Sequence, residues 1–199
     1  MTALWIVLAV VVLVGVGAAA SYNRFIKQRN LVQESWRQID VELTRRHDLI
    51  PNLIATVKGY AAHESSVIEA VTAARTAAQT AVGSAGPVGQ AQAENGLTRS
   101  LGGLFAVAEN YPTLKADTNF LALQQQLAET EDRIAAARRF YNGNVRALNT
   151  RIEAFPSSVI AGFGHFTKAE YFETDDPAVR APVTVDFGSI GSADTVPTA

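Results

Sequence analysis

Three histidines and one neighbouring glutamate are the side chains of this 199-residue chain that could support metal or acid–base chemistry. A zinc-protease helix carries two histidines four residues apart, with a glutamate between them as general base. His63 and Glu64 begin that pattern, but Val67 occupies the position of the second ligand. A di-iron bundle needs Glu-x-x-His pairs, and no glutamate here is followed by a histidine at that spacing. We therefore expect no metal, no cofactor and no catalytic residue.

Two other arrangements also fall short of an enzyme site. Ser157 and Ser158 precede His165, but no strained elbow motif surrounds either serine. The glycine-rich residues 83–89 are not followed by the lysine that a phosphate-binding loop requires, so they indicate a connector between helices. The chain has no cysteine, which excludes disulfides and thiolate chemistry.

The polar residues around position 47 form the strongest candidate for a binding site. Arg45, Arg46, Asp48 and Asn52 would make a docking point at one tip of a helical bundle, where paired guanidinium groups bind a partner's carboxylate or phosphate. The alternative is structural: the arginines end one helix, Asp48 caps the next, and Pro51 shapes its first turn. Both interpretations place a sharp kink or a tight turn of the chain at this point.

The elements that would position these residues begin with an apolar run, Leu4 to Ala20, which carries no charge. It is long enough for a helix to cross a bilayer, so residues 3–20 are expected to contact membrane lipid. A cleaved secretory signal is the alternative, but no basic residue precedes the run. Arg24, Lys27 and Arg29 follow it, which predicts a single-pass protein of the cytoplasmic (inner) membrane, with the short N-terminus outside and the rest in the cytoplasm.

The remainder of the chain has the periodicity and composition of helices. We predict an all-α fold, in which an N-terminal transmembrane helix is followed by an elongated antiparallel bundle of three to four long helices. The expected helical stretches are 22–46, 50–81, 88–110 and 114–155, and a short turn or helix at 156–172 folds back on them. The number depends on whether Pro51 bends one helix or reverses the chain. The corresponding units are an anchor at 1–23, a bundle at 24–173 and a mobile tail at 174–199, where Val183, Val185 and Phe187 alternate like a short strand.

Charge and composition limit the partners. The formal net charge is −2 and the basic residues are interspersed with acidic ones, so the chain has no stripe that would follow a nucleic-acid backbone. We expect neither a nucleic acid nor a small-molecule substrate. The paired Tyr141 and Asn142 predict a polar contact that fixes the register of the helices.

Long irregular strings of this sequence resemble the LemA family. They include RRHDLIPNL at residues 45–53, VKGY at 57–60, RRFYN at 138–142 and FPS at 155–157, and the resemblance extends over residues 1–173. His47 departs from it, because the family usually has tyrosine there. The resemblance implies a bacterial single-pass inner-membrane protein with a cytoplasmic helical bundle, and it implies no catalytic residues.

These observations favour a membrane-anchored, non-enzymatic interaction module or scaffold that associates with itself or with another membrane protein. An adaptor or regulator of a membrane protease or envelope-stress component is the alternative, with Arg45, Arg46 and Asp48 as contacts. An enzyme that uses His47 or Glu64 is the third possibility.

Overall fold

The computed structural model describes residues 1–173 and consists of helices joined by short connections. The long helices are α1 (Thr2–Tyr60), α2 (Ser65–Ala81), α3 (Gly86–Ala108) and α5 (Thr118–Glu153). Two short ones, α4 (Pro112–Lys115) and α6 (Ser157–Phe163), precede and follow α5. The all-α prediction is confirmed. The tail predicted at 174–199, with its possible strand, lies outside the described residues.

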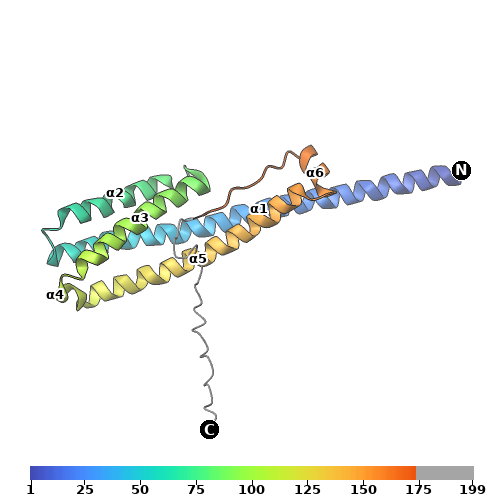
Figure 1. Cartoon of the computed structure of the whole chain (residues 1–199). Helices are drawn as coiled ribbons and strands as arrows, with labels where there is room; N and C mark the ends of the chain where they lie inside the picture. The colour runs from blue at the N-terminus through green and yellow to red at the C-terminus, as the bar shows by residue number, and fades with distance from the viewer. Residues whose placement is uncertain (174–199) are drawn as a thin grey trace, which may run out of the picture.

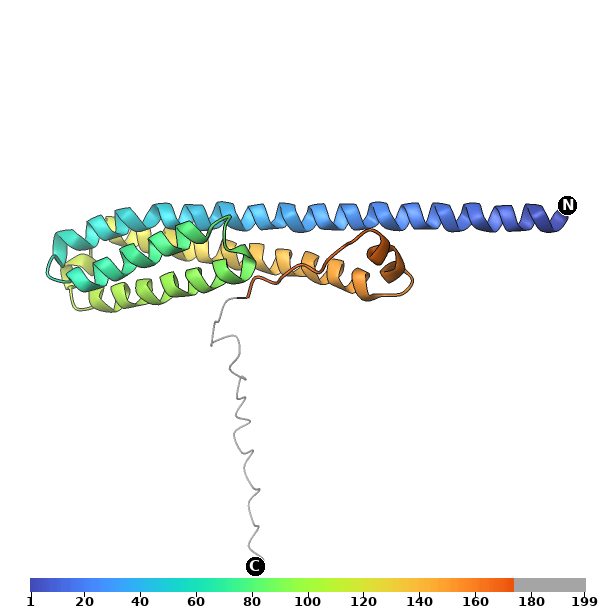
Figure 2. The same ribbon diagram turned by 90° about the horizontal axis from the view of Figure 1, so that it is seen from above.

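The architecture is an elongated bundle from which one helix projects. Helix α5 returns along the second half of α1, while α2 and α3 form a hairpin against the end of this pair that is farther from the N-terminus (Figures 1 and 2). Helix α1 has 59 residues and is about 89 Å long at 1.5 Å per residue. Its first part extends alone beyond α6 (Figure 2).

A seven-residue spacing of apolar side chains explains why α1 and α5 pair over such a length. On α5, the buried residues Phe120, Leu127, Ile134, Tyr141 and Leu148 are each seven positions apart. On α1, the buried positions from Ile39 to Val57 alternate in steps of four and three, with His47 as one additional buried residue. Such spacing keeps one stripe of each helix facing the other along its whole length.

The helix continues through Pro51, so of the two alternatives predicted there, a kink or a tight turn, the tight turn is wrong. Helix α1 continues to Tyr60, and the chain reverses at residues 61–64 instead. The apolar face predicted for one helix at 50–81 is therefore divided between the end of α1 and α2, which pack against each other. The reversal between α2 and α3 is built on Gly83 and Gly86, both with positive φ, a conformation that glycine adopts without strain.

The buried apolar residues form two clusters, which divide the bundle into a distal half and a proximal half. The distal half contains residues from all four long helices, including Ile50, Val71, Leu97 and Leu127. The proximal half, nearer the N-terminus, is built mainly from α1 and α5, with Phe25, Ile39, Val145 and Phe172 among its buried residues. In this half, an extended segment after α6 takes the place of the α2–α3 hairpin (Figure 1).

This extended segment, residues 164–173, is called the strap. Its backbone is held by two asparagine side chains of α5, each of which donates from Nδ2 and accepts at Oδ1. Asn142 makes both bonds with Phe172 (3.1 and 3.0 Å) and Asn149 makes both with Ala169 (2.9 and 2.9 Å). The seven residues from Asn142 to Asn149 on α5 rise about 10.5 Å, and the three extended residues from Ala169 to Phe172 on the strap span about 10 Å. The two asparagines are therefore spaced to reach these two residues.

The projecting part of α1 carries the apolar run. Its large side chains from Leu4 to Val16 are mostly exposed, and its most apolar window makes this helix long and apolar enough to cross a membrane. No residue of that window is buried against the rest of the protein. Burial inside a protein core therefore does not explain the apolar run.

Candidate functional site

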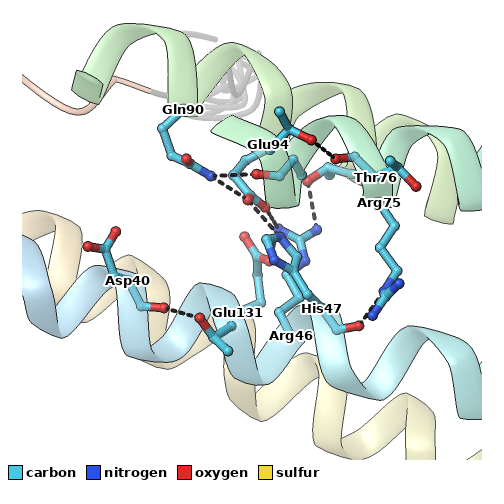
Figure 3. Close-up of polar contacts among 12 residues, drawn as sticks. Asp40, Arg46, His47, Arg75, Thr76, Gln90, Glu94 and Glu131 are labelled. Atoms are coloured by element: carbon cyan, nitrogen blue, oxygen red, sulfur yellow. Dashed lines mark hydrogen bonds and ion pairs between the residues drawn. The ribbon is translucent and has the colours of Figure 1, made fainter. Parts of the chain in front are cut away.

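Polar residues interrupt the apolar core where the distal and proximal halves meet (Figure 3). Arg46 occupies a core position of α1, three residues after Leu43 and four before Ile50, and it is 5 % exposed. His47 is next to it, and Gln90 and Glu94 approach from α3. We call Arg46, His47, Gln90 and Glu94 the buried polar cluster. Each of the four is at least nine-tenths buried.

Glu94 is the centre of the buried polar cluster. Its Oε1 accepts from His47 Nε2 and from Gln90 Nε2, both at 2.9 Å. Its Oε2 lies 3.5 Å from Arg46 Nη1. A carboxylate only accepts hydrogen bonds, so this contact fits the tautomer of His47 that has its proton on Nε2. The cluster thus connects α1 to α3 through one buried carboxylate.

Arg46 also reaches beyond Glu94. Its Nη2 donates to Thr98 Oγ1 at 2.8 Å, and its Nη1 lies 3.2 Å from Glu131 Oε2 on α5. The side chain of Glu131 is 55 % exposed, whereas that of Glu94 is 3 % exposed. Arg46 therefore links three helices, and a buried charge that is paired in this way avoids most of the penalty of leaving water.

Pro51 explains a further contact of the cluster. A proline has no amide hydrogen, so the carbonyl of His47, four residues earlier, receives no intrahelical hydrogen bond. Arg75 Nε on α2 donates to this carbonyl at 2.7 Å. The helix can thus accommodate Pro51 because a side chain from the neighbouring helix supplies the missing donor. Helix α2 is thereby attached to the same turn of α1 as α3 and α5.

The predicted docking residues separate into an inner and an outer set. Arg45, Asp48 and Asn52 lie on one exposed face of α1, where Arg45 Nη1 is 3.5 Å from Glu42 Oε2. Arg46 points inward, because it occupies a core position. The site is also not at a tip of the bundle, since α1 continues past it to Tyr60, and Asp48 caps no helix. Docking at the three exposed residues stays a prediction.

The other residues considered for chemistry are dispersed. His63 is exposed in the turn before α2, and Glu64 accepts from the Tyr111 hydroxyl at 3.1 Å. The Ser157 hydroxyl donates to the carbonyls of Arg151 and Ala154, so it serves the corner before α6. Within residues 1–173 no group of three or more His, Cys, Asp or Glu is arranged to hold a metal ion.

The far end of the distal half is held by tyrosine–carboxylate pairs. The Tyr60 hydroxyl donates to Asp117 Oδ2 at 2.9 Å, and Asp117 Oδ1 caps α5 by accepting from the Phe120 amide. Hydrogen bonds from the Phe120 amide and, to a smaller extent, from the Tyr60 hydroxyl lower the pKa of Asp117.

A separate carboxyl group, that of Asp40, lies farther back along α1. Burial raises the pKa of Asp40, and its Oδ1 has no hydrogen-bond partner among the described residues.

Some of these residues were missed from the sequence although a signal was present. Buried residues of α3 recur in steps of four and three at 90, 94, 97, 101, 104 and 108, so Gln90 and Glu94 occupy core positions of an otherwise apolar stripe. Asn142 and Asn149 are likewise one seven-residue step apart. Tyr141 and Asn142 do make buried polar contacts, but these bind the strap and not a second helix.

The sequence is similar to known proteins of one family. The model of the LemA family matches residues 35–187. Magnetosome proteins MamQ 1 and MamQ 2 of Paramagnetospirillum magneticum are each 30% identical over 186 residues, covering 81% of this chain and 68% of theirs. MamQ of Magnetospirillum gryphiswaldense is 27% identical with the same coverage. The family match, the relatives and the exposed apolar helix describe a membrane-associated helical protein. The chain belongs to the LemA family.

Proposed function

We propose that this protein is a non-enzymatic scaffold of the cytoplasmic membrane, anchored by one transmembrane pass and presenting its bundle to a second copy or to another membrane protein. One observation carries the proposal: a single helix is exposed and apolar at its beginning and is a core helix of the bundle at its end. A flexible linker is absent from this continuous helix. The bundle therefore keeps a fixed orientation to whatever holds the apolar segment.

The charges that flank the apolar segment support the proposed orientation. Arg24, Lys27 and Arg29 lie in the first turns after it, and no basic side chain precedes it. Basic residues remain preferentially on the cytoplasmic side of a membrane. In this arrangement the short N-terminus is outside the cytoplasm and the whole bundle is inside.

Orientation can be tested directly because the chain has no native cysteine. Single variants Thr2→Cys and Arg99→Cys would be expressed in intact cells and exposed to a membrane-impermeant maleimide. We expect labelling at position 2 in intact cells and at position 99 only after the inner membrane is opened. Labelling in the reverse order would contradict the orientation. If the mass of the expressed protein shows that the apolar segment has been removed, the segment is a cleaved signal.

The scaffold function needs a partner surface, and the outer face of α1 is the candidate. A photoreactive amino acid at Asn52, next to the exposed Arg45 and Asp48, would be activated in intact membranes. A product of twice the monomer mass that contains only this chain supports self-assembly. A discrete product with a second membrane protein supports the adaptor alternative. The same group at Arg99 on α3 is the matched control, and equal products from both positions would contradict a docking role for this face.

A further inference from the structure

An apolar groove lies where the projecting part of α1 meets the bundle. It has a volume of about 880 Å³, within the range of pockets that hold small molecules. Val14, Gly17 and Ala18 line it from α1, and Ala147, Ala154 and Ile160 line it from α5 and α6. The small residues of α1 leave the space open, because a side chain at Gly17 would meet nothing within 4 Å. The groove thus continues from the apolar segment toward the bundle.

Two arginines also line this groove, Arg24 from α1 and Arg151 from the last turn of α5. The ion pairs of residues 1–173 include neither of them. The Nε atom of Arg151 is buried and has no hydrogen-bond partner within the described part of the chain. Burial is the main cause that lowers the pKa of Arg151, and the positive charge of Arg24 is the second. An anion between the two guanidinium groups would relieve their repulsion and provide the missing acceptor.

The corner formed by the end of α5 and α6 exposes large apolar side chains at the same groove. Phe155, just before α6, and Val159 line it, and Phe163 is the last residue of α6. The three side chains are 85, 49 and 83 % exposed. Helix α6 lies next to α1 where the apolar segment begins to project (Figures 1 and 2). Aromatic side chains at this depth are typical of residues at the boundary between lipid headgroups and acyl chains.

We propose that this groove is a binding site for one anionic phospholipid, whose phosphate lies between Arg24 and Arg151 and whose acyl chain follows Val14, Gly17 and Ala18. The proposal rests on the transmembrane pass of the proposed function, which brings the groove to the membrane surface. Basic side chains directly after a transmembrane helix attract anionic headgroups. The apolar walls favour a lipid over a free phosphate ion, because the ion would leave them exposed to water.

The test uses the full-length chain in nanodiscs of phosphatidylcholine and phosphatidylglycerol in equal amounts, followed by native mass spectrometry of the released protein. We expect one retained phosphatidylglycerol in preference to phosphatidylcholine. Arg24→Gln combined with Arg151→Gln should lower this retention about tenfold or more, as expected for the loss of a charge-assisted contact. Arg99→Gln with Arg133→Gln, which removes two exposed charges elsewhere, should leave it unchanged.

A second variant pair tests the groove without touching the arginines. Gly17→Leu should fill the space and displace the lipid, whereas Gly15→Leu should not. Both glycines have nothing within 4 Å of an added Cβ, but only Gly17 lines the groove, so the two variants are matched in local space and differ in their position relative to the groove. Equal retention of the lipid by the two leucine variants would overturn the assignment.

The controls distinguish the possible failures. Inorganic phosphate added before release should not displace the lipid, and complete displacement would identify a simple anion site. If the chain enters the nanodisc but retains phosphatidylglycerol and phosphatidylcholine equally, the lipid site is refuted and the transmembrane anchor is not. A chain that does not enter the nanodisc would refute the transmembrane anchor, which belongs to the proposed function.

Discussion

The distal and proximal halves of the bundle share the helix pair α1 and α5 but are closed by different chemistry. In the distal half, the α2–α3 hairpin covers the pair with apolar side chains. In the proximal half, the strap covers it and is held by the side-chain amides of Asn142 and Asn149. Apolar burial in the distal half is distributed over two helices, whereas the strap combines one fully buried side chain, Phe172, with a few directional bonds. The proximal half should therefore open locally under changes that leave the distal half intact.

The largest expected effect is at the buried polar cluster, which joins α3 to the helix pair. Glu94→Gln should lower the free energy of unfolding by about 3 kcal/mol, because it leaves Arg46 and His47 without their common carboxylate. Urea unfolding in detergent, followed by circular dichroism, measures this. Glu131→Gln is the matched control, since its side chain is 55 % exposed, and should cost less than about 1 kcal/mol. Equal losses from both variants would argue against a central role for Glu94.

The strap provides the next effect, and it should be confined to the proximal half. Asn149→Ala removes two hydrogen bonds to Ala169, which together are worth about 2 kcal/mol. The side chain of Lys168 is already exposed, but the backbone after it would be free to enter the trypsin active site about thirty times more often when the strap opens. Cleavage after Lys168 should accelerate by that factor in Asn149→Ala and stay unchanged in Gln125→Ala on the same helix. Faster cleavage in Glu94→Gln as well would show that the two halves open together.

Periodicity predicts the helices of this chain, whereas contacts between distant segments decide features that local rules miss. The helical periodicity and composition of the chain after residue 22, together with the apolar run of α1, were sufficient to predict a transmembrane helix followed by a helical bundle. The path of the chain at Pro51 was not predictable from local rules, because proline normally ends a helix or bends it. Arg75, 24 positions farther along, supplies the donor that the helix lacks. Only the position of α2 reveals this contact.

The candidate site shows the same difference between what periodicity predicts and what contacts between distant segments decide. Arg46 was predicted either to dock a partner's carboxylate or phosphate or to end a helix. It does neither, because it occupies the core stripe of α1, where Glu94 on the corresponding stripe of α3 is its partner. Arg45, Asp48 and Asn52 lie on the exposed face, as docking requires. Binding at these three residues also depends on the surface of the partner, which the sequence of this chain does not contain.

A double-mutant cycle tests the explanation for Pro51, which concerns the distal half. Arg75→Met should cost about 1.5 kcal/mol, since the carbonyl of His47 loses its donor. In a Pro51→Ala background the backbone amide of residue 51 supplies that donor, so most of the loss should disappear. Urea unfolding of the four proteins gives the coupling. The same loss from Arg75→Met in both backgrounds would show that Arg75 acts elsewhere.

The smallest effect is a difference in pH dependence between the two halves. The pKa of Asp117 is lowered from the ordinary value of 3.8 in the folded protein, first by the Phe120 amide and then by the Tyr60 hydroxyl. A carboxyl with a depressed folded pKa stabilises the fold above its unfolded pKa, and this contribution is lost as the pH falls through the folded pKa. The distal half should therefore weaken on acidification below about pH 4.

Asn142 and Asn149 do not titrate, and the ion pair of Lys168 in the strap with Glu153 is exposed and contributes little, so the strap should keep most of its protection over the same pH range. Hydrogen exchange at low pH, compared between the start of α5 near Phe120 and its end near Asn149, measures both regions in one protein. Asp117→Asn retains an oxygen to cap α5 but has no proton to gain. This variant should abolish the acid-dependent weakening near Phe120 and leave the region near Asn149 as it was. If the acid effect persists in Asp117→Asn, Asp117 is not its source.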